Sequence, residues 1–496
     1  MRPRVWPAVV SAVLLALAFA PTSWVLLVFI APIPFLAELK NRRGWSAYRC
    51  GFCFGFVYFF FQFGWLVRLV GRWVGSPSLA LIPIGLGAFA EALLWFGGLG
   101  WLISKCWQND RPWLIPFVWA GVETVRSLVP GPAFPWGLLA SPLATTPTLI
   151  HLAWFGSIFM VSAWVLLTSL ATVQAFGGDL SNGRKTAIVF GLLGMVSIGR
   201  FFLVRPSGPT VLVEAGQPGV DLAFSNTGEA LQLHLLHIDN LTQDALNRKA
   251  KLLVFPEGAA RDFQWPLPPD FRLEPGLATL FGAHRSDGND VYQSALLYHG
   301  TSRQYADKNR LVVFGEYVPA RGMLPFLDAF KLPSGDLKSS DDIKNLKDGD
   351  LTVAPLICFE CLFPDIAYRK AAMGANLVAV ISEDNWFDHT AAMDQLRAGT
   401  IFRAVETGLP LVRSAETGYS MCIDEQGEVT GQAPLDQMAA VPCQVAAHPT
   451  GPFPLFPVFP ALAILSVGLA LVPSRSPSTR LLTPAAEDPP PEASAP

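Results

Sequence analysis

Long apolar stretches separated by short polar segments fill the first 205 residues of the chain. Most of them approach the roughly 20 residues that an α-helix needs to cross a bilayer, so the pattern predicts a bundle of about seven membrane-spanning helices. The first two stretches are expected to form a helical hairpin, because Pro21 disfavours the alternative of a cleaved signal peptide. The predicted spans cover residues 5–20, 23–39, 51–70, 79–103, 113–129, 147–173 and 186–204.

The pattern changes between residues 206 and 450, where short apolar runs alternate with amphipathic segments such as 228–248 and 394–406. Strands and helices that alternate in this way predict an α/β domain built of layers. A further membrane span is expected over 453–473, and the tail over 474–496, rich in Pro, Ala and Glu, is predicted to be disordered. The predicted strands cover residues 210–214, 252–255, 292–298, 311–314, 351–357, 377–381, 409–414 and 419–423.

Composition supports a membrane protein, since 51% of the residues are hydrophobic and only 15% are charged. The net charge of −3 and the lack of a basic stripe with interleaved aromatic residues predict no nucleic-acid partner. By the positive-inside rule, the lysines and arginines place the N-terminus in the cytoplasm and residues 206–450 outside it. Arg68 and Arg72, on a short outer loop, are exceptions, as are Arg200 and Arg205 at the outer end of the seventh span. The basic residues expected inside are Arg2, Arg4, Lys40, Arg42, Arg43, Arg49, Lys105, Arg111, Arg184, Lys185, Arg475 and Arg480.

Three charged residues fall within predicted spans, namely Glu91, Glu123 and Arg126. Charge in hydrocarbon is costly, so one interpretation gives them a role near lipid headgroups. Because Glu123 and Arg126 are one helical turn apart, mutual neutralisation is an equally good alternative.

The candidate chemistry centres on Cys358, which follows directly after an apolar strand and precedes a short helix over 364–373. Such an elbow exposes a side chain at a strand end, and a second strand brings Ser382 and further polar residues to the same edge. A thiol with an ordinary pKa near 8.5 needs help to react at neutral pH. Lys308 offers a positive charge, and Glu257, at the end of another apolar strand, offers a proton acceptor.

The seven cysteines include two pairs spaced as CxxC, Cys50 with Cys53 and Cys358 with Cys361. A zinc or redox site needs both thiols of a pair in one polar site. The first pair lies at the mouth of an apolar span and the second lies on the elbow, so we predict no metal site and no cofactor.

Several sequence motifs then indicate a protein family. The segments YADKNRLVVFGEYVP, ICFE and FRAVETGLPLVRSAETG, together with GFCFGFVYFF, VETVR and FPWGL earlier in the chain, resemble the apolipoprotein N-acyltransferases. These enzymes are membrane-bound members of the nitrilase, or carbon-nitrogen hydrolase, superfamily. The resemblance runs from about Leu14 to Gly427 and implies a membrane bundle followed by a four-layer α-β-β-α sandwich. It also implies that Glu257, Lys308 and Cys358 form a catalytic triad.

The resemblance assigns supporting roles to Glu316 and Glu360, and it makes the backbone N–H of Phe359 a partner of Lys308 in stabilising an oxyanion. Tyr292, Trp386 and Arg403 also match the family and are expected to bind substrate, with a framework role as the alternative.

The chain departs from the family at several of these positions. Glu383 and Glu416 stand where the family usually has Asn, Glu214 stands where Gln is usual, and Phe359 stands where Tyr is common. Gln395 is followed by Leu396 instead of His. Extra carboxylates near a headgroup or an amine would change which substrate fits.

The leading hypothesis is a ping-pong acyltransferase of the bacterial cytoplasmic (inner) membrane, with its catalytic domain outside the cytoplasm. A phospholipid donates an acyl chain to Cys358, and the N-terminal amine of a lipoprotein accepts it. The alternatives are a membrane-anchored nitrilase-type amidase, associated with plasmid transfer, and a catalytically idle binding module. A transferase must shield its thioester from water, and the turn at 134–136 and the loop at 332–350, which could act as a lid, are the expected shields.

Overall fold

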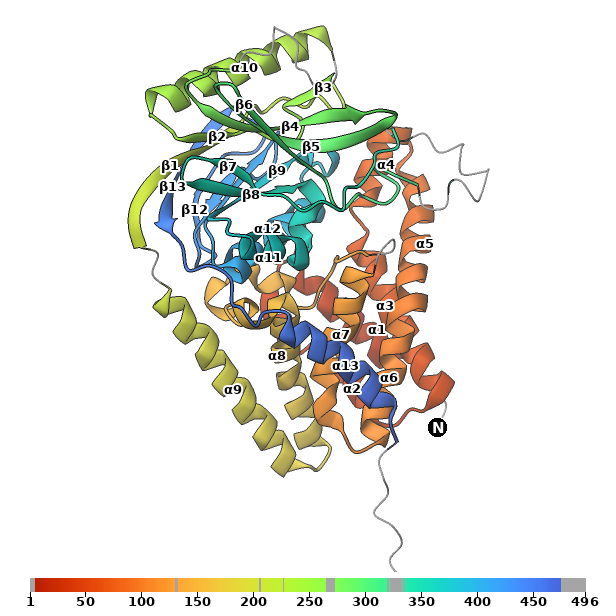
Figure 1. The fold of residues 1–496 in the computed structure, drawn as a ribbon. Coiled ribbons are helices and arrows are strands. Elements are labelled where there is room, and N and C mark those ends of the chain that lie inside the picture. Colours follow the sequence, from red (N-terminus) through yellow and green to blue (C-terminus); the bar gives the residue numbers. More distant parts are fainter. Residues whose placement is uncertain are drawn as a thin grey trace, which may run out of the picture.

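The computed structural model describes residues 5–129, 133–204, 207–225, 227–264, 273–318, 321, 332 and 335–473. An α-helical bundle forms one half of the molecule and a two-sheet α/β domain forms the other (Figure 1). The tail predicted over 474–496 lies outside the described residues, as does part of the loop predicted at 332–350. The helices of the bundle are α1 (Trp6–Ala18), α2 (Ile33–Lys40), α3 (Gly44–Gln62), α4 (Leu66–Val74), α5 (Leu81–Glu91), α6 (Gly97–Gln108), α7 (Ile115–Leu128), α8 (Ala153–Phe176), α9 (Leu180–Leu203) and α13 (Val458–Leu471).

The C-terminal helix α13 returns from the α/β domain to pack on α7 and α8. Helices α7 and α13 approach closely at Gly121 of α7, where a Cβ atom would lie 2.2 Å from the carbonyl oxygen of Ala463 in α13. A residue without a side chain is therefore required, as is common where helices meet in membranes.

Within the described residues, three helical stretches are long and apolar enough to cross a bilayer: 77–108, α8 and α9. The pair α3 and α4 would make a fourth, although the two helices are bent by 53° relative to each other. Two shorter apolar helices, α1 and α13, lie beside them. The predicted division into a membrane domain over 1–205 and a final span over 453–473 stays a prediction.

The second predicted helix, over 23–39, is not continuous. A 3₁₀ turn covers Val25–Phe29, and α2 begins only at Ile33. Proline explains the break, because Pro32 is the N-cap of α2 and Pro34 lies in its first turn, where the missing N–H groups would have no helical partner in any case.

The α/β domain has the predicted four layers (Figure 1). Among the described residues, one sheet has seven strands, six in the order β13-β1-β2-β4-β5-β6 with β3 paired to β4, and the other has six in the order β12-β11-β10-β9-β8-β7. Helix α10 covers the outer face of the first sheet, and α11 and α12 cover the outer face of the second. The predicted fold class is confirmed. The elements are β1 (Ser207–Gln217), α10 (Gly228–Asn247), β2 (Leu252–Val254), β3 (Ala260–Gln264), β4 (Ala278–Asp287), β5 (Asp290–His299), β6 (Ser302–Asp307), β7 (Leu346–Asp348), β8 (Leu351–Ile357), α11 (Pro364–Ala372), β9 (Leu377–Ser382), α12 (Ala391–Thr407), β10 (Leu411–Ala415), β11 (Met421–Ile423), β12 (Val429–Gln432) and β13 (Ala439–His448).

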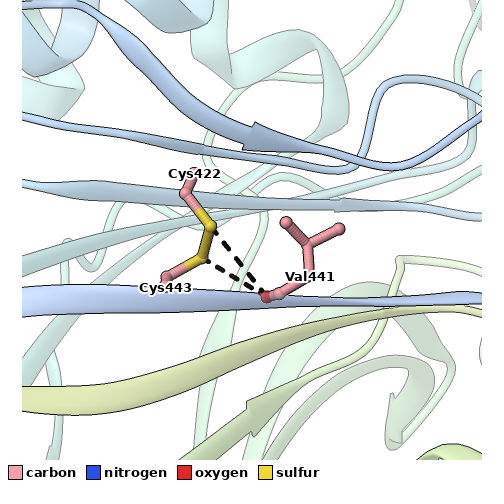
Figure 2. The surroundings of a disulfide bond; sticks show 3 residues. All are labelled: Cys422, Val441 and Cys443. Carbon is pink, nitrogen blue, oxygen red and sulfur yellow. Dashed lines mark hydrogen bonds between the residues drawn. A yellow bond between two sulfur atoms is a disulfide. The ribbon is translucent and has the colours of Figure 1, made fainter.

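A disulfide bond between Cys422 and Cys443 links the two sheets (Figure 2). Cys422 lies on β11 of the six-stranded sheet and Cys443 lies on β13 of the seven-stranded sheet. Both residues belong to the apolar core between the sheets. The bond therefore crosses the apolar interior between the sheets near one edge of the sandwich, a feature that the sequence analysis did not predict.

Buried polar contacts join the α/β domain to the bundle. Glu406 of α12 accepts hydrogen bonds from the Ser157 hydroxyl (2.9 Å) and from the backbone N–H of Ile158 (2.8 Å). These bonds cap α8 at the point where Ser157, with φ 69°, interrupts its helical geometry. Gln395 of α12 donates to Gln62 of α3 at 2.8 Å. Helix α12 thus fixes the sandwich on the bundle.

Candidate active site

Cys358 lies at the elbow that the sequence predicts, directly after strand β8. Its φ of 52° is left-handed, a conformation that costs energy for a residue with a side chain and is typical of functional turns. Strand β9 runs parallel to β8 with Ile357 opposite Ile381, so Cys358 and Ser382 follow at the same edge of the sheet. The elbow therefore holds the cysteine and the polar residues after β9 side by side.

Lys308 is fully buried and joins two carboxylates. Its Nζ atom lies 3.0 Å from Oε1 of Glu257 and 2.5 Å from Oε1 of Glu316. Lys308 follows strand β6, whereas Glu257 follows β2, so the topology of the seven-stranded sheet brings them together. The second carboxylate oxygen of Glu316 accepts the backbone N–H of Val312 at 2.9 Å, which fixes its orientation.

The charges of this cluster decide where protons reside. Burial raises the pKa of the Cys358 thiol well above its ordinary value, and the Glu257 carboxylate raises it further, while Lys308 opposes both effects. Although burial alone would lower the pKa of Lys308, Glu257 and Glu316 raise it well above its usual value. Burial also raises the pKa of Glu316, against the effect of Lys308. The resting site therefore holds a neutral thiol beside a charged lysine, and a base must remove the thiol proton when sulfur attacks.

Glu360 does not approach these groups directly but connects the segments that carry them. One carboxylate oxygen accepts the backbone N–H groups of Asn309 (2.6 Å) and Arg310 (3.1 Å), next to Lys308. The other oxygen accepts the N–H of Ile357 at 2.8 Å, next to Cys358. Glu360 is completely buried, so it holds the lysine loop against the cysteine elbow.

Phe359 faces the bundle. Its ring centroid lies 5.7 Å from that of Phe134 and 5.4 Å from that of Phe363. Arg126 of α7 in turn binds the carbonyl oxygens of Phe134 (2.9 Å) and Trp136 (2.8 Å). The turn at 134–136, predicted as a shield, is thus held against the residue that follows Cys358. The predicted role of the Phe359 N–H in binding an oxyanion stays a prediction.

Glu123 and Arg126 of the bundle each contact groups other than the pairing with each other that their spacing suggested. Arg126 forms its ion pair with Glu91 of α5, with 3.4 Å between nitrogen and oxygen. Glu123 accepts the indole N–H of Trp119 (3.1 Å) and the backbone N–H of Leu139 (2.8 Å). Arg126 and Glu123 therefore fix the two ends of the turn that runs beneath the site.

The three residues expected to bind substrate each contact other side chains of the protein. Tyr292 stacks beside the Arg285 guanidinium, 4.8 Å from its ring centroid. Arg403 is buried and binds Glu406 (2.7 Å) and the carbonyl oxygen of Leu362 (3.0 Å). These are contacts of a framework residue, the alternative that the sequence allowed. Trp386 stacks on Trp73 of α4, with 5.3 Å between ring centroids.

A polar chain behind Cys358 was not assigned from the sequence. Ser382 donates to Asp384 at 2.6 Å, and Asp384 accepts from the fully buried Arg413 at 2.7 Å. The fit around Asp384 requires glycine at 418, because a Cβ there would lie 2.2 Å from a carboxylate oxygen. Ser382 and Asp384 stood in the polar segment after β9, but Arg413 becomes visible only through the pairing of β9 with β10.

The departures from the family also have defined positions. Glu383 lies beside Gly258, where a Cβ would be 3.4 Å from its Oε1 atom, and so borders the loop that carries Glu257. Glu416 pairs with His234 of α10, with 3.0 Å between Oε1 and Nδ1. In the part of the chain that the structure describes, no group of three or more His, Cys, Asp or Glu side chains is placed to hold a metal ion.

Comparison with known proteins supports both halves of this architecture. Residues 274–446 match the carbon-nitrogen hydrolase family model, and residues 11–171 match the model of the apolipoprotein N-acyltransferase N-terminal domain. An amidase of the nitrilase superfamily from Nesterenkonia AN1 has a solved structure that covers 49% of this chain and 93% of its own, at 18% identity and a TM-score of 0.35.

The α/β half is thus a carbon-nitrogen hydrolase domain, carried here on a bundle of apolar helices. Over most of the chain, the curated relatives are apolipoprotein N-acyltransferases. The protein from Geobacter metallireducens is 28% identical over 458 residues, which cover 88% of both chains. The protein from Pasteurella multocida is 24% identical over 494 residues, which cover 94% of this chain and 93% of that one. The predicted resemblance to the apolipoprotein N-acyltransferase family is confirmed.

Proposed function

We propose that the protein transfers a fatty acyl chain from a phospholipid to the N-terminal amine of a lipoprotein through a thioester on Cys358. The names of the relatives support lipoprotein N-acylation, and the bundle gives the site access to lipid. The observation that carries the mechanism is the buried Lys308, which faces Glu257 at 3.0 Å beside the cysteine elbow.

In the first half-reaction, the Cys358 sulfur attacks the ester carbonyl carbon as the thiol proton passes to Glu257. The C–O bond of the phospholipid then breaks, and the lysophospholipid leaves as an alcohol that takes the proton from Glu257. In the second half-reaction, the amine attacks the thioester and gives a proton to Glu257. The C–S bond breaks, an amide forms, and the proton returns to sulfur.

Both tetrahedral intermediates carry a negative oxygen. The Lys308 ammonium and the Phe359 N–H are the proposed donors to it. Loss of one such donor in a buried site costs about 3 to 4 kcal/mol of transition-state stabilisation. Glu316 and Glu360 support this arrangement, the first by orienting the ammonium and the second by joining the two backbone segments.

The proposed location is the bacterial inner membrane, with residues 1–205 and 453–473 in the bilayer and residues 206–450 outside the cytoplasm. The disulfide between Cys422 and Cys443 supports this orientation, because such bonds form and persist in oxidising compartments and are rare in the cytosol. The contacts of Arg68 and Arg72 with the α/β domain also account for two cations on the outer side.

One experiment separates transfer from hydrolysis. Purified protein is incubated with phospholipid vesicles alone, and mass spectrometry is used to detect an acyl group on Cys358. We expect a stable acyl-enzyme that is discharged when a diacylated lipopeptide is added, with the acyl chain recovered on the lipopeptide amine. Steady release of fatty acid without lipopeptide would instead indicate a hydrolase, and no acyl-enzyme at all would overturn the proposal.

A further inference from the structure

Helix α4 reaches out of the bundle and lies beside the α/β domain (Figure 1). None of its residues is fully buried, and it is bent by 53° from α3, although Leu66 and Val70 pack in part against the hydrophobic core. Its contacts with the α/β domain therefore help to decide where it lies.

Arg72 forms the centre of these contacts. Its guanidinium binds Oδ2 of Asp221 (2.5 Å) and the carbonyl oxygen of Asn385 (3.0 Å), and it lies 3.8 Å from Oδ2 of Asp388. The same group covers the ring of Phe224 at 3.7 Å from the centroid. One cation thus compensates two carboxylates and a carbonyl that come from two separate loops.

Aromatic packing extends this joint. Trp73 stacks in parallel on Trp386, with 5.3 Å between centroids and 2° between planes, and Phe224 packs edge-on against both rings. On the preceding turn, Trp65 packs against Phe387 at 5.4 Å. Four consecutive residues, 385–388, are thereby held against α4.

The segment held by α4 leads directly to the nucleophile. Ser382, next to Cys358 at the sheet edge, donates to Asp384, which precedes the clamped residues. Asp384 also lines a cavity of about 230 Å³ whose wall includes Arg72, Asp221 and Asp388. Ser382 and Asp384 thus connect this polar cavity to the cysteine elbow, and the cavity is a polar space from which water could reach a thioester.

We propose that Arg72 is a positioning residue that keeps the loop at 384–388 closed and so protects the acyl thioester from water. This inference rests on the proposed function. Without the guanidinium, Asp221 and the Asn385 carbonyl would lose their cation, and Asp388 would keep only its ion pair with the exposed Arg68. The demand of the Asp221 carboxylate and the Asn385 carbonyl for hydration would then move the loop outward and admit water.

The consequence is a change in the fate of the acyl group. Water would attack the thioester carbonyl and give a proton to Glu257, the C–S bond would break, and the proton would return to the Cys358 sulfur as the fatty acid leaves. The products would be free thiol and fatty acid in place of free thiol and amide. The first half-reaction uses Glu257, Lys308, Cys358 and the Phe359 N–H, none of which contacts Arg72, and would proceed in either case.

The test measures the lifetime of acyl-Cys358 in vesicles of equal parts phosphatidylethanolamine and phosphatidylglycerol, without lipopeptide, by mass spectrometry over time. Arg72→Gln should shorten this lifetime about tenfold, the effect expected from losing hydrogen bonds to a charged group, and should raise the ratio of fatty acid to amide when lipopeptide is present. The initial rate of Cys358 acylation should stay within about twofold of wild type, since the contacts of Arg72 involve none of the three triad residues.

Arg72→Lys, which keeps the cation, should retain most of the lifetime, whereas a general disturbance at this position would shorten it as well. Arg68→Gln is the matched control, because the Arg68 side chain is 65% exposed in its ion pair with Asp388. It should leave the lifetime unchanged. An unchanged lifetime in Arg72→Gln, with normal acyl-enzyme in wild type, would overturn this inference alone. Absence of acyl-enzyme in wild type would overturn the proposed function, and the inference with it.

Discussion

The Nζ atom of Lys308 lies closer to Glu316 (2.5 Å) than to Glu257 (3.0 Å). The shorter contact belongs to the carboxylate that also accepts a backbone N–H, and so to the one whose position is fixed. Glu316 therefore anchors the ammonium and leaves Glu257 able to exchange protons with Cys358. The structure gives the two carboxylates different tasks although both touch the same lysine.

This division predicts that Glu316→Gln slows the acylation of Cys358 without preventing it. An amide oxygen still accepts from Lys308 but carries no charge, so the rate should fall about tenfold to a hundredfold. Glu257→Gln should abolish acylation, because it removes the proposed base. Rates of acyl-enzyme formation, measured by mass spectrometry, would decide the matter, and equal losses in the two variants would contradict the separate roles.

The raised pKa of Cys358 predicts an unusual pH dependence of its alkylation. An ordinary thiol approaches its maximal alkylation rate above a pKa of about 8.5. Because burial and Glu257 raise the pKa of Cys358 well above its usual value, its rate with iodoacetamide should still be rising there. Removing the negative charge in Glu257→Gln should lower this pKa and speed alkylation at neutral pH, although the variant cannot transfer an acyl group.

Cys361 provides the internal comparison for this experiment. It is fully buried, and its Sγ atom lies 3.7 Å from the carbonyl oxygen of Leu396, so it should remain unmodified in the folded protein. Cys361→Ala should retain acylation, whereas Cys358→Ala should lose it. An alkylation rate that levels off below pH 8 would show that the thiol is activated at rest.

The disulfide predicts a thiol count and a compartment. Of the seven cysteines, all within the described residues, five are free in the structure. Denatured protein should therefore bind five alkylating groups before reduction and seven after it. Cys422→Ser opens a cross-link that spans 21 residues and should cost about 3 kcal/mol, seen as a lower Tm.

A reporter fused after Gly300 should be active only in its extracytoplasmic form, and seven free thiols in protein from intact cells would contradict this orientation.

The sequence was sufficient for those parts of the site that lie at strand ends. Cys358, Glu257 and Lys308 each stand at or next to the end of an apolar or alternating run, and parallel strands place their ends at a common edge. The alternation of such runs with helices predicted α/β layers, and the resemblance to the family implied that the layers number four.

Contacts between distant elements could not be predicted in the same way. The partner of Cys422 depends on how the two sheets face each other, and the partner of Arg126 depends on which helix packs beside α7. A one-turn spacing made Glu123 the obvious neighbour of Arg126, yet Glu91 of another helix takes that place. Arg72 likewise looked like a loop cation until its partners on the α/β domain were known.

The Arg126 network predicts a large effect from a residue remote from the chemistry. Arg126→Met would leave Glu91 buried without its cation and the carbonyls of Phe134 and Trp136 without a donor, a loss of about 3 to 5 kcal/mol. Thermal unfolding in detergent would measure it. Glu91→Gln, which keeps a hydrogen-bond acceptor, should cost less. Similar Tm values for all three proteins would show that the network carries little stability.

The last prediction concerns Glu416, which stands where the family usually has Asn. The Nδ1 atom of His234 lies 3.0 Å from Oε1 of Glu416, and its Nε2 atom lies 3.0 Å from the carbonyl oxygen of Ala259. Both side chains are buried, so the His234 ring connects Glu416 to the backbone of the loop after β2 inside the fold.

Because Ala259 lies two residues after Glu257, this pair steadies the loop that carries the base and need not contact substrate. Glu416→Asn shortens the side chain, so the buried His234 ring should lose its partner and stability should fall by about 2 to 3 kcal/mol. Glu416→Gln should cost about 1 kcal/mol, since the acceptor oxygen remains. In the double variant with His234→Asn, most of the loss should be recovered, because the buried ring that lost its partner is no longer present. Calorimetric Tm values test this order of stabilities. Acyl transfer to lipopeptides with different N-terminal residues tests the alternative that Glu416 contacts the substrate. A Glu416→Asn protein of unchanged stability but altered acceptor preference would place Glu416 at the substrate.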